Sequence, residues 1–99
     1  MSEYAETLRR HARIAILRLL EDAPRYTSNA SMMAALLPQL GISYTRDQIA
    51  GELSWLAEQG LVTTQQTAGL LMATATLRGI EVAQGIAIVP GVQRPSPQV

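Results

Sequence analysis

The feature that constrains the fold most is a helix-start signal near the middle of the chain. Thr45 and Gln48 have the spacing of a capping box, in which side chains and backbone N–H groups at a helix start satisfy each other. Tyr44 and Ile49 occupy the two positions of a hydrophobic staple around it. Apolar residues then recur at helical spacing as far as Gly60, which predicts a helix that ends there.

A shorter helix is expected immediately before this one. Ser28 and Asn29 are both good N-caps, and Pro38 should end or kink the helix before a break at Gly41. Two helices joined by the short turn of residues 41–44 form a helix-turn-helix unit. The side chains expected to point inward from the shorter helix are Met32, Met33, Leu36 and Leu37.

After Gly60 the pattern changes from helical to strand-like. Residues 61–66 and 70–75 have the character of two short strands. The three residues between them, 67–69, end in Gly69 and are suited to a tight turn. The segment is therefore predicted to be a β-hairpin.

A last helix follows the hairpin. Thr76 is its N-cap, the helix covers residues 77–84, and Gly85 closes it. The order of helix, helix, recognition-type helix, two-stranded wing and helix is that of the winged helix-turn-helix. We therefore predict a mainly α, α+β fold, a winged helix-turn-helix with a two- or three-stranded wing and a long N-terminal helix.

The first helix is predicted over residues 2–21 and carries more apolar surface than one small core needs. Besides its main apolar stripe, Ile14, Leu17 and Leu20 form a second apolar face. A helix that touches only one small core needs a narrower stripe, so this face suggests a partner subunit. Residues 25–27 should form an extended bridge to the next helix.

Prolines exclude a regular helix at the C-terminal end, where three of them fall within eight residues. We predict a winged helix-turn-helix domain over residues 1–86 and a proline-rich extended tail over residues 87–99. Ile88 and Val92 are the side chains through which this tail would pack.

Composition excludes several classes of function. A chain of 99 residues fits one domain, and the absence of cysteine removes disulfides, thiolate metal sites and cysteine nucleophiles. His11 has no evident partner, and neither a Gly-rich phosphate loop nor a hydrolase motif is present. We expect no catalytic, cofactor or metal site. The sequence has neither a signal peptide nor a membrane-spanning apolar run, so we expect a cytoplasmic protein without a membrane partner.

Two segments resemble parts of ArsR- and MarR-type bacterial regulators. They are residues 52–62, at the end of the recognition helix and the first wing strand, and the Thr76, Gly79, Ala83 pattern after the wing. The whole chain more narrowly resembles small ArsR-like winged-helix proteins encoded by Mu-like phages and prophages. This resemblance implies a phage-derived regulator, and without a cysteine or histidine cluster it does not imply metal sensing. The matching segments are residues 13–20, 45–48, 55–62 and 90–95.

A DNA-binding protein of this class reads the major groove with the N-terminal end of its recognition helix. Arg46 could bond to guanine and Gln48 to adenine, the usual bidentate partners. The alternative is that Thr45 and Gln48 only cap the helix and that Tyr44 only packs on Ile49. The predicted DNA contacts on this helix and on the wing are Ser43, Tyr44, Thr45, Arg46, Gln48, Gln65, Gln66 and Thr67.

The basic residues of the first helix are a second candidate. Arg9, Arg10 and Arg13 form the only basic cluster of the sequence and could contact phosphates or an acidic partner. The alternative is a solvated helix face on which Glu6 pairs with Arg9 and Arg10 at helical spacing.

Charge argues against strong DNA binding by a single copy. Eight arginines balance eight acidic residues, and lysine is absent. Residues 42–76 have one arginine and three acids, a net charge of −2. Because affinity for duplex DNA comes largely from neutralising phosphates, dimerisation or arginines elsewhere would have to compensate. The three acids, expected on a solvated helix face, are Asp47, Glu52 and Glu58.

Large apolar side chains outside the main stripes have two interpretations. Trp55, the only tryptophan, either covers the base of the wing or serves as an exposed anchor for a partner. The methionines are interpreted as filling the core rather than as a functional patch. These methionines are Met32, Met33 and Met72.

We predict a sequence-specific DNA-binding transcriptional regulator of phage or prophage origin that acts as a homodimer on double-stranded DNA. The first and last helices would build the dimer and place two recognition helices about one turn of DNA apart. The alternative is a winged-helix protein–protein interaction module without significant DNA affinity, which the net charge of −2 favours.

Overall fold

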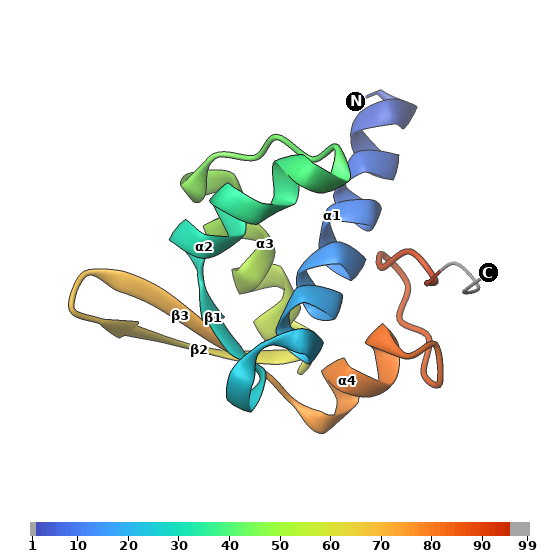
Figure 1. Cartoon of the computed structure of the whole chain (residues 1–99). Coiled ribbons are helices and arrows are strands. Elements are labelled where there is room, and N and C mark those ends of the chain that lie inside the picture. Colours follow the sequence, from blue (N-terminus) through green and yellow to red (C-terminus); the bar gives the residue numbers. More distant parts are fainter. Residues whose placement is uncertain (1, 96–99) are drawn as a thin grey trace.

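The computed structural model describes residues 2–95 (Figure 1). Within them, four α-helices and a three-stranded antiparallel sheet make a mostly helical α+β domain. The elements in chain order are α1 (Glu3–Asp22), the 3-10 turn η1 (Pro24–Tyr26), β1 (Thr27–Asn29), α2 (Ala30–Leu36), the 3-10 turn η2 (Leu37–Leu40), α3 (Arg46–Glu58), β2 (Val62–Thr67), β3 (Leu70–Ala75) and α4 (Leu77–Ala83).

Each α-helix begins at an N-cap that the sequence predicted. Ser2, Asn29, Thr45 and Thr76 each accept a hydrogen bond from a backbone N–H of the first turn that follows. The capping box of α3 is complete: the N–H of Gln48 donates to Thr45 Oγ1 at 3.1 Å, and the N–H of Thr45 donates to Gln48 Oε1 at 2.9 Å. These bonds satisfy N–H groups that a helix cannot satisfy internally, so they fix where each helix starts.

The sheet has the strand order β1-β3-β2, so the hairpin is extended at one edge by a short strand. The hairpin turn is tighter than predicted, with only Ala68 and Gly69 between the strands, both in the left-handed region at φ 52° and 80°. Such a two-residue turn matches the right-handed twist of the flanking strands. Figure 1 shows the hairpin projecting from one side of the helices.

The prediction of an extended bridge over residues 25–27 is wrong for its first two residues. Arg25 and Tyr26 belong to η1 and both have a φ of 57°, and the extended chain starts only at Thr27. Thr27 lies opposite Thr74 of β3, and their hydroxyl oxygens are 2.9 Å apart. The extended chain from Thr27 pairs with a strand far along the sequence, an interaction that local patterns do not reveal.

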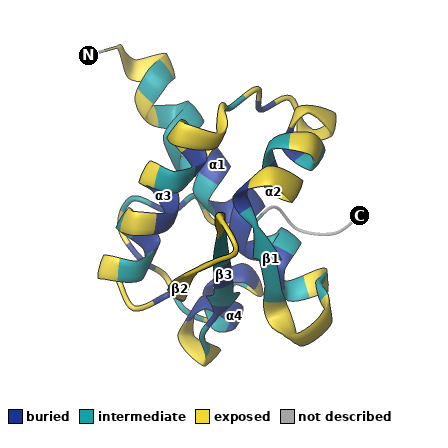
Figure 2. Ribbon diagram, turned by 90° about the vertical axis from the view of Figure 1, so that its left-hand side faces the viewer, coloured by how far each residue is buried: buried dark blue, intermediate teal, exposed yellow. Residues whose placement is uncertain are grey.

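The hydrophobic core lies between the helices and the sheet (Figure 2). Met33 and Leu37 point inward as predicted, whereas Met32 is 49% exposed and Leu36 and Met72 are partly exposed. The prediction that Met32 lies inside is therefore wrong, because the seven-residue α2 presents only one narrow face to the core. The largest fully buried side chains are Ile16, Leu17, Leu20, Met33, Leu37, Ile49, Leu53, Leu56 and Leu61.

The second apolar face of α1 is buried within the chain itself. Ile14, Leu17 and Leu20 are all buried, and α4 packs against α1 on this side. The contact is close at Gly79, where an added Cβ would lie 3.4 Å from Leu17 Cδ2. This face therefore needs no partner subunit at Leu17, where α4 packs against it, whereas the buried Ile14 borders an open hollow between α1, η2 and the tail.

The C-terminal tail packs onto the domain as far as the structure describes it. Val92 is buried as predicted, but the second buried side chain is Val89, and Ile88 is exposed. The N–H of Gln93 donates to the carbonyl of Arg10 on α1 at 3.2 Å. Residues 87–95 are thus held against the helices, and the remainder of the predicted tail, residues 96–99, lies outside the described residues.

Candidate nucleic-acid interface

The N-terminal end of α3 is open to solvent. Ser43, Thr45, Arg46 and Gln48 are exposed, and Tyr44 is half-buried against the core. The end is open because the first inward side chain of α3 is Ile49, so the residues before it extend beyond the core. Figure 2 looks onto this side of the molecule, with the hairpin in front and α3 and α2 on its two flanks.

The capping role of Thr45 and Gln48 limits what they can offer a ligand. The Thr45 hydroxyl accepts one capping bond and the Gln48 carbonyl oxygen accepts the other. Bidentate pairing of glutamine with adenine needs both the carbonyl oxygen and the NH₂ group of the amide. While the capping box is closed, the Gln48 carbonyl oxygen retains one lone pair and its orientation is set by the cap, so a base must fit the amide in this fixed position.

Tyr44 stays a neutral hydrogen-bonding group at physiological pH. Burial raises the pKa of its phenol, and the negative charge of Glu52 raises it further. The positive charges of Arg9 and Arg13 act in the opposite direction. Arg9 on α1 is thus within electrostatic reach of the start of α3.

Arg46 is the cation at the exposed end of α3. It borders a hollow of about 170 Å³ between the start of α2, the start of α3 and the hairpin. Gln66 and Leu70 line the same hollow from the hairpin side. Arg46 and the hairpin therefore share one surface, and within the described part of the chain Arg46 has no ion pair.

The hairpin presents uncharged polar side chains. Every residue of β2 after Val62 is exposed, including the predicted contacts Gln65, Gln66 and Thr67. Gln65 lies opposite Met72, and Thr67 lies opposite Leu70. These side chains can donate and accept hydrogen bonds but contribute no charge.

Arg13 occupies a different place from the one predicted. Its Nε donates to Glu52 Oε1 on α3 at 2.6 Å, and its Nη1 donates to the carbonyl of Gly91 in the tail at 3.0 Å. Its guanidinium carbon also lies 3.9 Å from the centroid of the Trp55 ring. Because these contacts occupy the guanidinium inside the fold, the prediction of Arg13 as a phosphate contact is wrong.

Glu52 and Trp55 are also placed differently from the predictions. Glu52 is only 7% exposed, so it does not belong to a solvated helix face. Trp55 is not a free anchor for a partner, because it is half-buried between Arg13 and Gly91 of the tail. The spacing of Glu52 from Ile49 and Leu56 placed it on the apolar stripe of α3, and this signal could have revealed its burial.

Arg9 and Arg10 lie at the surface and pair with Glu6 as predicted. The Arg9 Nη2–Glu6 Oε1 distance is 3.3 Å, and the Arg10 Nη1–Glu6 Oε2 distance is 3.8 Å. Arg10 also donates to the hydroxyl of Thr7 at 3.3 Å. Exposed ion pairs of this kind contribute only about 0–1 kcal/mol, so a phosphate could replace Glu6 at little cost.

The charge of the exposed surface is closer to neutral than the sequence suggested. Arg13 compensates Glu52 internally, which leaves Arg46, Asp47 and Glu58 as the uncompensated charges of residues 42–76, a net charge of −1. Among residues 2–95, no group of three or more histidine and acidic residues could hold a metal ion. No helix in that part of the chain is long and apolar enough to cross a membrane.

Together these features describe a small, mostly helical α+β domain that exposes a helix end and a polar hairpin on one surface. The chain belongs to the family of the uncharacterized protein gp26 of Escherichia phage Mu, to which it is 42% identical over 86 residues, or 87% of this chain and 88% of gp26. It is also 34% identical over 76 residues to an uncharacterized protein of Haemophilus influenzae, covering 76% of this chain and 74% of that protein. The resemblance to Mu-phage proteins is thus confirmed. No protein-family model and no solved structure matches the chain.

Proposed function

We propose that the chain is a winged helix-turn-helix and that it acts as a sequence-specific DNA-binding transcriptional regulator of phage origin in the cytoplasm. In this assignment α2 and α3 form the helix-turn-helix, α3 is the recognition helix, and β2 and β3 form the wing. The element order and the strand order β1-β3-β2 support it. The kinship with a phage Mu protein supports the phage origin.

The observation that carries the proposal is the exposed hairpin beside the exposed start of α3. From Thr63 onward, β2 buries no side chain, so this part of the ribbon contributes little to the core. Its Thr and Gln side chains are suited to phosphate and sugar contacts, which fix the position of a protein on DNA. The hollow shared by Arg46 and Gln66 supports a single surface on which α3 and the hairpin act together.

Each predicted contact other than Arg13 takes a role that fits its surroundings. Arg46 reads a guanine edge, since it is exposed and unpaired among the described residues. Arg9 and Arg10 contact phosphates, exchanging Glu6 for the DNA backbone. The uncharged groups that add hydrogen bonds to bases or backbone are Ser43, Tyr44, Thr45, Gln48, Gln65, Gln66 and Thr67.

The DNA-binding form is a homodimer in this proposal. One copy offers little positive charge, so two copies are needed to neutralise enough phosphates for useful affinity. The expected half-sites lie about one helical turn apart, roughly 34–36 Å from centre to centre. The outer face of α1 and the exposed Leu77 of α4 are the surfaces that the first and last helices leave available for the partner.

Arg46→Ala is expected to weaken binding to the specific site by about 1–3 kcal/mol and to relax the preference at one base pair. The measurement is a fluorescence-anisotropy titration of duplexes from the gene's own neighbourhood at low and moderate salt. Arg78→Ala is the matched control, because Arg78 is exposed on α4, away from the proposed surface. An unchanged sequence preference in Arg46→Ala would remove this residue from the site.

The paired variant Arg9→Ala/Arg10→Ala separates phosphate contacts from base contacts. Each lost phosphate contact should lower the slope of log K against log salt by about 0.9, so the pair should lower it by about 1.8. The base preference should remain, because phosphate contacts carry no direct sequence information. A slope equal to that of the wild type would show that these arginines contact no phosphates.

A protein–protein interaction module is the second candidate function. The near-neutral surface favours it, since Arg46 stands next to Asp47 and residues 62–75 of the hairpin carry no charge. A folded dimer that fails to bind duplex DNA even at low salt would support this function over the first.

A further inference from the structure

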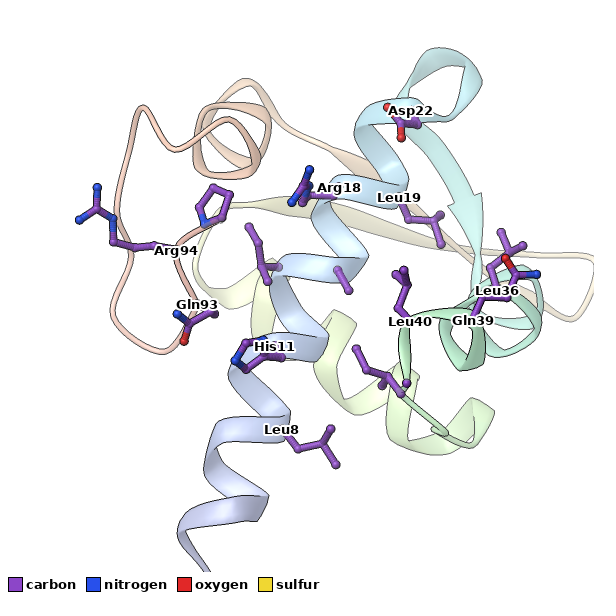
Figure 3. A pocket seen from close by; sticks show the side chains of 15 residues that line it. Leu8, His11, Arg18, Leu19, Asp22, Leu36, Gln39, Leu40, Gln93 and Arg94 are labelled. Atoms are coloured by element: carbon purple, nitrogen blue, oxygen red, sulfur yellow. The ribbon is translucent and has the colours of Figure 1, made fainter. Parts of the chain in front are cut away.

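A broad trough runs along the outer face of α1, and none of the predicted DNA contacts lines it (Figure 3). Its volume is about 660 Å³. The residues of α1 that line it extend from Leu8 to Asp22, a length of about 21 Å at the rise of an α-helix. The trough is therefore an elongated concave surface, with α1 as its floor and with η2 and the tail as its two walls.

The two sides of the trough differ in chemistry. Leu36 and Leu40 line the side of α2 and η2, and Leu40 is 63% exposed. Arg94 lies on the tail side, and Arg18 lines the trough from α1. Neither arginine forms an ion pair within residues 2–95. The trough therefore combines an apolar side with two cations that no acid of the described chain neutralises.

The apolar side continues beyond the trough. Leu19 and Leu36 also line a second hollow of about 550 Å³, together with Met32 and Met72. Met32 is 49% exposed and Met72 is partly exposed. Methionine side chains are flexible and polarisable, so they adapt to the apolar side chains of a partner. A continuous exposed apolar surface of this kind is typical of an interaction site.

The shape of the trough favours a helix over an extended peptide. Its walls are a helix, a 3-10 turn and the irregular tail, so it offers no strand edge with which the backbone of an extended peptide could pair. A helix satisfies its backbone hydrogen bonds internally and needs only side-chain contacts from a groove. A helix of about four turns matches the length of the trough.

We propose that the trough binds an amphipathic, acidic helix of another protein. The apolar stripe of this helix lies on Leu36 and Leu40, and its acidic flank faces Arg18 and Arg94. The sign of the charge follows from complementarity, because Asp22, at the C-terminal end of α1, is the one acid among the described residues that line the trough.

The inference goes beyond DNA binding and does not depend on it, because the trough and the predicted DNA contacts share no residue. It identifies the surface that a protein–protein interaction module would use. A helix in the trough occupies the outer face of α1, which leaves the exposed Leu77 of α4 for the proposed homodimer.

Selection from a displayed library of random peptides tests the class of partner. The peptides have about 16 residues, roughly the length of the trough as a helix. The full chain is the target, and Arg18→Glu/Leu40→Glu serves for counter-selection, so that the retained peptides depend on the trough. They should carry apolar residues at helical spacing and a net negative charge. Failure to enrich any peptide, or enrichment of basic peptides, would overturn the proposal.

A charge exchange tests the pairing with a selected peptide by fluorescence anisotropy. Arg18→Glu/Arg94→Glu should raise the dissociation constant by about tenfold or more, because like charges are then juxtaposed. A version of the peptide with lysine in place of each acid should prefer this variant to the wild type. Arg25→Glu/Arg78→Glu changes the net charge equally at exposed positions outside the trough and should bind the original peptide unchanged. Equal losses in the two double variants would overturn the pairing.

An uncharged substitution separates the trough from the other proposed interfaces. Leu40→Ser should weaken peptide binding, whereas Leu77→Ser, at the 77% exposed position of α4, should not. Unaltered urea unfolding curves would show that both variants fold. Weaker self-association of Leu40→Ser in sedimentation equilibrium would overturn the proposal in favour of a second copy of the chain. A chain that binds the peptide but no DNA would retain the trough as a binding site and contradict the proposed regulator.

Discussion

Gly79→Ala is expected to destabilise the domain by about 3 kcal/mol, the upper end of the usual range for overpacking. A Cβ at this position would overlap the carbonyl oxygen of Leu61 and stand 3.1 Å from its carbonyl carbon. These are backbone atoms and cannot rotate away, so α4 would have to move off the end of α3 and the start of β2. The better helix propensity of alanine, worth up to about 1 kcal/mol, offsets only part of this cost.

Thr76 explains why α4 lies so close to this backbone. Its N–H donates to the Leu61 carbonyl at 3.0 Å, and its hydroxyl donates to the Gly60 carbonyl at 2.8 Å. The same hydroxyl accepts a bond from the N–H of Gly79 at 3.1 Å. The spacing of Thr76, Gly79 and the buried Ala83 is therefore a packing motif that attaches α4 to the hairpin base and to α1.

Gly51→Ala is the matched control for this prediction. Gly51 also lies inside a helix, but nothing stands within 4 Å of an added Cβ. Alanine there should stabilise the domain by about 0.5–1 kcal/mol through helix propensity and a less flexible unfolded chain. Urea unfolding followed by circular dichroism measures both variants. Equal effects of the two substitutions would show that α4 does not approach Leu61 as closely as described.

Glu52→Ala is the second substitution with a large expected effect, a loss of about 3–5 kcal/mol in the free energy of unfolding. It removes the acidic partner of a guanidinium that is itself largely buried. Arg13 would retain the Gly91 carbonyl and the face of Trp55, but neither carries a compensating charge. The cost is therefore that of an uncompensated buried charge rather than that of one lost hydrogen bond.

Glu6→Ala provides the comparison at an exposed site. Glu6 also pairs with arginines of α1, at 3.3 and 3.8 Å, but both partners are solvated. Its removal should change the stability by less than about 1 kcal/mol. A loss from Glu52→Ala as small as that from Glu6→Ala would contradict the burial of the Arg13–Glu52 pair.

The double variant Arg13→Met/Glu52→Leu distinguishes charge from packing. It leaves no unpaired charge, so it should be more stable than Glu52→Ala even though the tail loses its bond from Arg13. Trp55, the only tryptophan, reports on the contact through its fluorescence, because the guanidinium lies over its ring. The emission should change in this variant and remain unchanged in Glu6→Ala.

The Arg13 contact also explains why the tail has a glycine at residue 91. Gly91 has a φ of 95°, and an added Cβ would lie 2.8 Å from Trp55 Cζ2 and 3.2 Å from Arg13 Nη1. Only a residue without a side chain lets its carbonyl approach the guanidinium so closely in this conformation. The described part of the tail thus packs between α1 and α3, through Val92 as the sequence predicted and through Gly91, which the sequence did not single out.

The sequence alone determined the features that depend on a few neighbouring residues. The caps at Asn29, Thr45 and Thr76, the helix ends at Gly60 and Gly85 and the location of the hairpin all follow from interactions within about one helical turn or one tight turn. The exposure of the residues at the start of α3 could also be predicted from the sequence, because these residues precede the apolar stripe of that helix.

Tertiary structure decided which charged and apolar groups remain available to a partner. Arg13 and Glu52 are 39 positions apart, and nothing local distinguishes Arg13 from the surface residues Arg9 and Arg10. The second apolar face of α1 suggested a partner subunit, whereas in the fold its residues are buried and α4 packs against Leu17. Contacts across the fold depend on how the helices are arranged, so residues with similar local patterns can lie in the interior or at the surface.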